Sequence, residues 1–295
     1  MQDGFVATLG TFDGVHRGHR GLLNTLRRVS RRRRLRSLAI LFSEPPRFYF
    51  NSRLKTPLIT PPSERAELLK SMGIDRIRIL RFNPHWARMT HTRFFGHYLI
   101  RRWRVRGLVI GPDFAFGHGR KGNAEWLEAE CRRLEMTFCL HSFTKAGRRK
   151  ISSSRIRELL MQGDVSAARR LLGRPYRVEG RVTRGRGLGR KLGFPTANLR
   201  VPAGKLLPRG VYKVRVYGSG VGDAARAGAC NIGTRPSVSG KSRLHVEVHI
   251  PGFSGNLYGK MLRLDFLKFL RPEKKFKSLA ALKAQIGLDV HRAGR

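Results

Sequence analysis

The chain has 295 residues, of which 40% are hydrophobic; this is enough for ordinary buried cores and excludes a wholly disordered protein. At roughly 150 residues per domain, the length predicts two domains. The formal net charge of +42 comes from 61 Lys and Arg against 19 Asp and Glu, so the chain should attract polyanions.

Membrane and disulfide-bonded classes are disfavoured. The longest apolar run, around 38–42, is far shorter than the ~18 residues of a membrane span, and no secretory segment precedes the first strand. The three cysteines, Cys131, Cys139 and Cys230, lack CxxC spacing, which predicts reduced thiols and no cysteine metal site. We therefore expect a cytoplasmic protein with no membrane partner.

The arginines are spread along the whole chain, with local runs at 31–34 and 101–106. Aromatic residues do not alternate with them as a stacking platform for single strands requires. We expect weak, non-specific binding of polyanions, and the alternative is a basic surface that is simply solvated.

The first half alternates short apolar runs with longer amphipathic stretches. The predicted strands are Phe5–Leu9, Ser37–Phe42, Arg76–Leu80, Gly107–Ile110 and Met136–Leu140. The predicted helices are Gly18–Arg33, Pro62–Met72, Thr92–Arg102, Ala124–Arg133, Ser153–Gln162 and Val165–Leu172. Strands separated by helices predict an α/β domain with a doubly wound parallel sheet, whose ligands bind at the carboxyl ends of the strands.

The pattern changes near Gly173, where apolar residues begin to alternate and glycines recur at short intervals. The predicted strands are Arg177–Thr183, Gly210–Tyr217, Ala227–Ile232, Leu244–Ile250 and Met261–Leu270. They predict a small antiparallel, Greek-key-like β-barrel, closed by a helix over Lys277–His291 with Ser278 as its N-cap. The predicted domains are 1–173 and 174–295.

The stretch Ala7–Arg20, ATLGTFDGVHRGHR, is the most informative motif. A buried strand breaks at Gly10 and Gly14, and His16 and His19 stand at the start of the next helix. A helix N-terminus offers unpaired N–H groups and the positive end of the macrodipole, so it suits phosphate. Histidines there can add hydrogen bonds or positive charge; two surface histidines in a glycine-rich turn are the alternative.

Two later segments should converge on the same nucleotide site. In 111–122, Asp113 follows a strand and can bond a ligand, while phenylalanines can pack on a flat ring; a structural turn-capping Asp is the alternative. In 150–157, Lys-Ile-Ser-Ser-Ser-Arg-Ile-Arg, hydroxyls and cations at a helix start can cradle polyphosphate. A serine-rich N-cap before an amphipathic helix is the alternative there.

In this order and spacing, LGTFDGVHRGH, GPDFAFG and KISSSRIR resemble the adenylyltransferase half of the bacterial bifunctional riboflavin kinase/FAD synthetase family, with its HxGH-type nucleotidyltransferase fold. The resemblance implies that the 5′-phosphate of FMN attacks the α-phosphorus of ATP, giving FAD and pyrophosphate with the help of Mg²⁺. It implies catalytic roles for His16 and His19. The ATP- and phosphate-binding residues it implies are Gly10, Phe12, Asp13, Ser152, Ser153, Ser154 and Arg157, and the flavin-facing ones are Asp113 and Phe114.

In the second half, 185–198 has the composition of a phosphate loop. Its glycines let the backbone approach a ligand, Arg190 and Lys191 supply charge, and Thr196 and Asn198 offer oxygens to a hard cation such as Mg²⁺. A flexible surface loop is the alternative. Further on, Glu247 lies on a predicted strand and can accept a proton from an attacking hydroxyl, or else it simply faces solvent.

This half resembles the riboflavin kinase module of the same family through GRGLGRKLGFPTANL, NIGTRPS, HVEVHI, NLYGK and FLRPEKKF. The implied reaction is attack of the ribityl 5′-hydroxyl of riboflavin on the γ-phosphate of ATP. The resemblance implies Glu247 as the base and Thr196 and Asn198 as ligands of Mg²⁺. The phosphate-loop residues it implies are Gly187, Arg190, Lys191 and Gly193, and Tyr258 and Arg271 would border the flavin.

The sequence departs from the family pattern at four places. Thr11 stands where Asn is more frequent, Pro46 where His is frequent, and Arg235 where Asn is usual, while 252–256 lacks the usual acids. Two other functions stay open at this point. One is a nucleotidyltransferase for a non-flavin acceptor, and the other is a basic nucleic-acid-binding protein on a degenerate enzyme scaffold.

Overall fold

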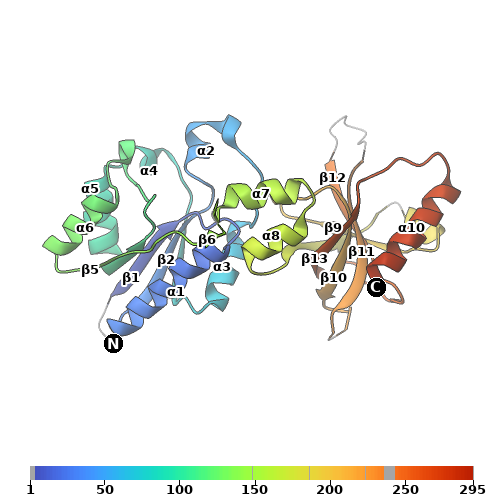
Figure 1. Cartoon of the computed structure of the whole chain (residues 1–295), viewed down its shortest axis with the longest axis horizontal. Coiled ribbons are helices and arrows are strands. Elements are labelled where there is room, and N and C mark those ends of the chain that lie inside the picture. The colour runs from blue at the N-terminus through green and yellow to red at the C-terminus, as the bar shows by residue number, and fades with distance from the viewer. Residues whose placement is uncertain (1–3, 148, 186, 223, 236–242, 295) are drawn as a thin grey trace. The chain divides into compact units, whose positions relative to one another are not determined.

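The computed structural model describes residues 4–147, 149–185, 187–222, 224–235 and 243–294. Contacts divide the chain into two compact units, Met1–Ser153 and Ser154–Arg295, and each is described by itself (Figure 1).

The first unit is built on a five-stranded sheet in the order β3-β2-β1-β4-β5, and every pairing in it is parallel. Its strands are β1 (Phe5–Gly10), β2 (Arg36–Phe42), β3 (Arg76–Leu80), β4 (Val105–Ile110) and β5 (Thr137–Leu140). Its longer helices are α1 (Arg17–Arg32), α3 (Pro62–Ser71), the π-helix η2 (Phe94–Arg102) and α6 (Ala124–Arg133). Its shorter elements are α2 (Arg47–Phe50), η1 (Ser52–Leu54), α4 (Pro84–Arg88), α5 (His91–Arg93), η3 (His118–Arg120), β6 (Lys145–Ala146) and β7 (Arg149–Lys150).

Helices cover both faces of this sheet because successive strand residues point to opposite sides. Val6 and Ala39 pack in one core with Leu23 of α1. Ala7 and Leu38, their neighbours along the strands, pack in a second core with side chains of η2 and α6. The prediction of a doubly wound parallel sheet is therefore confirmed.

The second unit is a closed barrel in the order β10-β11-β12-β9-β8-β13. Its strands are β8 (Tyr176–Thr183), β9 (Thr196–Arg200), β10 (Gly210–Gly218), β11 (Arg226–Arg235), β12 (Arg243–His249) and β13 (Met261–Arg271). The helices are α7 (Ser153–Met161), α8 (Val165–Leu172), α9 (Leu188–Lys191) and α10 (Leu279–Gly294). Helix α10 packs against β10 and β11, so it covers one outer flank of the barrel (Figure 1).

The structure confirms the predicted strands and long helices to within a few residues, and it adds elements that the pattern did not indicate. Strand β9 was not predicted, because only Leu199 among its five residues is buried and the apolar alternation is too weak. The range predicted as one helix over 92–102 is a short α-turn followed by a π-helix. Ser278 caps α10 as predicted, since its Oγ accepts a hydrogen bond from the N–H of Ala281 at 3.1 Å.

The three cysteines are all free. Among the described residues, no helix combines the length and the apolar character needed to cross a membrane.

Candidate functional sites

The turn between β1 and α1 places two histidines at the first helical turn. His16 is the N-cap of α1, and its Nδ1 accepts a hydrogen bond from the N–H of His19 at 3.3 Å. The two rings stack with centroids 3.6 Å apart, and the ring of Phe12 meets His19 edge-on. Because Nδ1 of His16 accepts, a neutral His16 carries its proton on Nε2.

Electrostatics keep His19 uncharged. Burial, then the neighbouring His16, then the guanidinium of Arg65 lower the pKa of His19 well below its ordinary value. Its Nδ1 is buried and has no hydrogen-bond partner within the described part of the chain. In the absence of a bound phosphate, the neutral form of His19 is therefore favoured.

The turn itself is held by a second segment, which the sequence analysis did not single out. Phe12 and Val15 have positive φ values of 52° and 41°, a strained conformation for residues with a Cβ. Asp13 is buried, and its carboxylate accepts hydrogen bonds from the N–H groups of Ile59 and Thr60 at 3.2 and 2.9 Å. The hydroxyl of Thr60 accepts from the N–H of Gly14 at 2.8 Å.

Arg65 of α3 ties the same turn to the next strand. Its side chain is fully buried, and the guanidinium donates to the backbone carbonyls of Thr11, Phe42 and Ser43. The carbonyl of Thr11 follows β1, that of Phe42 is the last in β2, and that of Ser43 follows β2. All three therefore lie at the carboxyl ends of the strands, where a doubly wound sheet binds ligands. Sequence offers no signal for this role, because an arginine on an amphipathic helix is normally exposed.

A largely apolar pocket of about 630 Å³ opens beside this turn. Its walls include the end of β1 (Leu9, Gly10, Thr11), Pro46 and Phe50 of the α2 region, and the 113–120 loop. Phe114 and Phe116 stack there at 5.6 Å. The volume and the aromatic lining suit a flat, drug-sized ligand. Two positions where the chain departs from the family pattern, Thr11 and Pro46, therefore lie in this wall.

Two of the residues predicted to bind ligands here, Asp113 and Ser153, already contact other groups of the protein. Asp113 lines the pocket but pairs with Lys150. Ser153 donates its hydroxyl to the carbonyl of Asp13 at 2.7 Å, so it braces the histidine turn. Ser152 is half-buried in the first unit, whereas Ser154 (exposed) and Arg157 (buried) belong to the second.

In the barrel, strand register assembles a polar row on one face. Glu247 of β12 lies opposite Asn198 of β9 on one side and Asn231 of β11 on the other. Thr196 lies two residues before Asn198 and therefore on the same face, opposite His249. Val246 and Val248, which alternate with Glu247, are buried. The polar row is thus on the outside of the barrel, and the missed strand β9 is what brings Thr196 and Asn198 to Glu247.

A pocket of about 300 Å³ lies over this row. Glu247, Thr196 and Asn198 form part of its floor; other walls come from the glycine loop, including Gly187, and from α10. Arg271 also lines it, and its guanidinium makes a bidentate ion pair with Asp289 of α10 at 2.8–3.1 Å. Both side chains of the pair are mostly buried, so Arg271 anchors the helix that forms a wall of the pocket.

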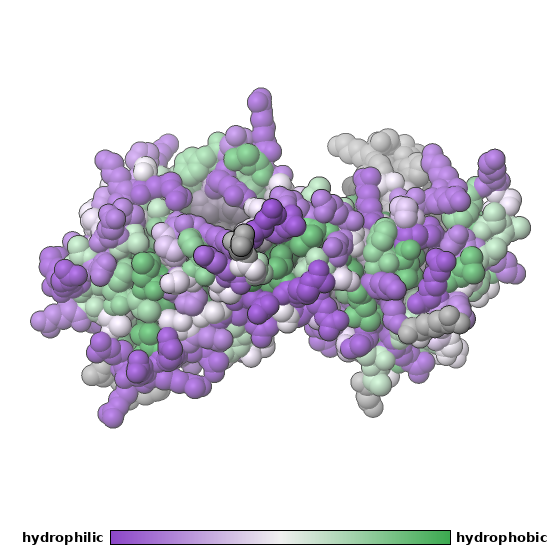
Figure 2. Space-filling model, in the orientation of Figure 1, coloured by the Kyte–Doolittle hydropathy of each residue, from purple (hydrophilic) through white to green (hydrophobic). Residues whose placement is uncertain are grey.

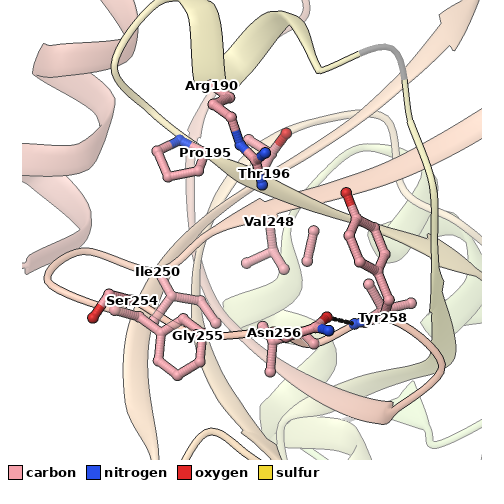
Figure 3. Close-up of a pocket in the computed structure, with 13 residues that line it drawn as sticks. Arg190, Pro195, Thr196, Val248, Ile250, Ser254, Gly255, Asn256 and Tyr258 are labelled. Atoms are coloured by element: carbon pink, nitrogen blue, oxygen red, sulfur yellow. Dashed lines mark hydrogen bonds between the residues drawn. The ribbon is translucent and has the colours of Figure 1, made fainter.

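A second barrel pocket, of about 540 Å³, lies on the other side of Thr196. Figure 3 shows Arg190 and Thr196 on one side of the hollow and Ser254 and Asn256 on the other. Tyr258, which the sequence analysis grouped with Arg271, lines this pocket instead. Gly193 and Lys191 are exposed at the end of the glycine loop. The side chain of Arg235 and the last two residues of NIGTRPS, 236 and 237, lie outside the described residues.

The side-chain oxygens of Thr196, Asn198 and Glu247 fit a magnesium ion only if substrate phosphates and waters supply its other ligands. The residues that the structure describes contain no group of three or more His, Cys, Asp or Glu placed to hold a metal. Mg²⁺ binds through few protein oxygens when substrate phosphates and waters supply the rest. One carboxylate and two neutral side-chain oxygens match that pattern.

The structure thus offers two candidate sites, a histidine turn on a parallel α/β sheet and a carboxylate beside a glycine loop on a barrel. The FAD synthetase family model matches residues 1–155, and the riboflavin kinase model matches 172–295. The bifunctional riboflavin kinase/FMN adenylyltransferase of Escherichia coli K12 is 38% identical, covering 98% of this chain and 91% of its own. The protein of the same description from Pseudomonas fluorescens is 36% identical, with 98% and 92% covered.

The chain belongs to the family of bifunctional riboflavin kinase/FMN adenylyltransferases, and it is an enzyme with both activities. A solved structure from Streptococcus pneumoniae, described as a macrolide-efflux protein, is 29% identical with a TM-score of 0.87, covering all of this chain and 95% of its own. Neither alternative left open by the sequence, a non-flavin acceptor or a degenerate nucleic-acid binder, is favoured by these matches.

Proposed function

We propose that the two sites act in sequence on one flavin, with the barrel making FMN from riboflavin and the α/β unit making FAD from FMN. The main support is that Thr196 lines two barrel pockets at once, with Glu247 in one and Arg190 in the other. A phosphoryl donor in one pocket and an acceptor in the other would meet at the shared wall.

In the barrel, the Arg190 pocket takes ATP and the Glu247 pocket takes riboflavin, bordered by Arg271. The ribityl 5′-hydroxyl loses its proton to Glu247 and attacks the γ-phosphorus, and ADP leaves. Thr196 and Asn198 would hold Mg²⁺ together with the ATP phosphates, and the ion would supply charge neutralisation there. Gly187, Lys191 and Gly193 belong to the loop that covers these phosphates, and Tyr258 closes the ATP side.

In the α/β unit, the N-terminus of α1 receives the phosphates of ATP, and His16 and His19 form hydrogen bonds with them. The apolar pocket beside Phe114 and Asp113 takes the flavin ring. The phosphate of FMN attacks the α-phosphorus, and pyrophosphate leaves towards Ser152. Gly10 and Phe12 bring the backbone close to the nucleotide, while Asp13 and Ser153 act by shaping the turn.

Three predictions about the whole enzyme belong to the same proposal: its domain boundary, its location and its binding of polyanions. We place the functional boundary at 173/174 and the enzyme in the cytoplasm. The +42 charge should give weak binding of polyanions besides catalysis.

Glu247→Gln tests the proposal. It should slow riboflavin phosphorylation by about 10²–10⁴-fold, the usual contribution of a general base, while adenylylation of supplied FMN continues. His19→Ala should give the opposite split. Incubation with Mg-ATP and riboflavin or FMN, with chromatographic separation of FMN and FAD, measures both steps. A Glu247→Gln enzyme whose kinase rate stays within about tenfold of the parent would show that Glu247 is not the base.

A further inference from the structure

Surface charge does not mark a further site, because hydrophilic side chains are spread over the visible face of both units (Figure 2). The contacts of one barrel histidine, His249, do. His249 is the last residue of β12, two residues after Glu247 and on the same outer face of the barrel. Its half-buried side chain lines the Glu247 pocket. The proposed kinase mechanism leaves this histidine without a role.

The ring of His249 contacts the segment that joins the glycine loop to β9. Its Nδ1 lies 2.8 Å from the carbonyl oxygen of Pro195. On the same segment, the ring of Phe194 meets the imidazole edge-on, with centroids 5.6 Å apart. His249 therefore links the strand of the proposed base to the chain that leads into Thr196.

The direction of this hydrogen bond follows from its acceptor. A carbonyl oxygen only accepts, so Nδ1 of His249 carries a proton and donates it to Pro195. Both the neutral and the charged imidazole can donate from Nδ1, so the bond does not require a charged ring. In the neutral ring, Nε2 is then the unprotonated nitrogen.

The segment depends on side-chain contacts because the strand ladder stops there. The pairing of β12 with β9 ends at His249 and Thr196. Pro195, the next residue outwards, has no N–H with which to continue the ladder. The ring of His249 contacts it instead. Towards the glycine loop, the N–H of Phe194 donates to the carbonyl of Gly189 at 2.7 Å, which folds the loop back onto the same segment.

Holding the carbonyl of Pro195 fixes the position of Thr196. The peptide unit that joins the two residues is planar, so an anchored oxygen orients the nitrogen and Cα of Thr196 as well. Thr196 lines both barrel pockets, with Arg190 in one and Glu247 in the other. Figure 3 shows Pro195 and Thr196 beside Arg190 on one side of the hollow.

We propose that His249 is a positioning residue for riboflavin phosphorylation. Its ring holds the backbone of Pro195 and thereby keeps the hydroxyl of Thr196 at the wall between the two barrel pockets. The inference rests on the kinase site proposed above, and it assigns His249 no contact with ATP or riboflavin.

The test compares two neutral replacements of the ring. The amide nitrogen of Asn takes the place of Nδ1, whereas that of Gln takes the place of Nε2. His249→Asn should therefore keep the bond to Pro195 and most of the kinase rate. His249→Gln should lose the bond, and a shift of about 1 Å at Thr196 should then slow riboflavin phosphorylation by about 10²-fold. FMN adenylylation and a cooperative barrel melt in both variants show that the chain is folded.

A second measurement asks whether His249 acts through Thr196. In the Thr196→Ala enzyme, adding His249→Gln should cost far less than in the parent, because two residues that serve one contact are not additive. Calorimetric titration with Mg-ADP gives a readout besides turnover. Binding should weaken in His249→Gln and in Thr196→Ala, and it should recover in His249→Asn.

Three results would overturn the inference. The first is a parent-like kinase rate in His249→Gln. The second is recovery with Gln and not with Asn, which would make Nε2 a direct contact of a ligand. The third is an equal cost of His249→Gln with and without Thr196. Parent-like phosphorylation by both Thr196→Ala and Glu247→Gln would instead overturn the proposed site itself, and the inference with it.

Discussion

Replacing Asp13 with Ala should release the histidine turn. In the parent, its carboxylate satisfies two buried backbone N–H groups, those of Ile59 and Thr60. Each buried donor left without a partner costs about 1–3 kcal/mol, so the first unit should lose about 2–6 kcal/mol of stability. The strain at Phe12 and Val15, about 1–3 kcal/mol each, favours relaxation of the freed turn.

A displaced turn should misplace His16 and His19, and a shift of about 1 Å in a reacting group can cost about 10²-fold in rate. FAD formation from supplied FMN should therefore fall by about that factor in the Asp13→Ala enzyme. Thermal unfolding of the first unit should occur about 4–24 °C lower, at about 2–4 °C per kcal/mol. Riboflavin phosphorylation by the same preparation is the internal control and should be unchanged.

Asp13→Asn is the matched variant, because its amide retains one acceptor oxygen and so preserves part of the interaction. Its losses in rate and stability should be smaller than those of Asp13→Ala. Parent-like FAD formation in Asp13→Ala would refute the reasoning. A rate loss with unchanged melting would instead assign Asp13 a direct contact with ATP.

Further predictions concern both sites. Asp289→Asn weakens the ion pair that anchors α10 to Arg271. It should therefore raise the KM for riboflavin at least several-fold while FMN adenylylation is unaffected. An unchanged KM would show that this ion pair does not shape the riboflavin pocket. Gly185→Ala places a Cβ in steric conflict with the side-chain amide of Asn198, so kinase activity should fall through weaker use of Mg²⁺, and parent-like magnesium dependence would contradict this. Because the pKa of His19 is lower folded than unfolded, the unfolded state binds more protons below about pH 6.5, and stability should decrease as pH falls through that range. In His19→Gln, the free energy of unfolding, measured by denaturant titration at several pH values, should depend less on pH. An unaltered pH dependence would show that other groups cause it.

Sequence predicted the parts of this molecule that depend on local pattern. Apolar runs indicated the strands of the parallel sheet, and glycines with basic residues indicated the loop near Gly187. Contacts between distant segments could not be predicted in this way. Asp13 was expected to face ATP, because nothing local shows that Ile59 and Thr60 supply its partners.

The barrel shows the same limit. Glu247 and Asn198 were assigned separate roles, but their direct pairing depends on β9, whose alternation is too weak to detect. Tyr258 and Arg271 were grouped at the flavin by the family resemblance, and the fold sends them to different pockets. Sequence pattern thus predicted candidate site residues but not which of them line the same cavity.

The position of the polar row outside the barrel has a consequence for the end of the chain. The barrel interior is filled by residues such as Val246 and Val248, so its strands do not need α10 to exclude water from their core. The pocket beside Glu247 does need α10, which supplies Leu282, Ile286 and Val290 to its wall. Proteolytic removal of α10 should therefore leave a folded barrel that no longer binds riboflavin. Riboflavin phosphorylation would then be lost, while FMN adenylylation would continue.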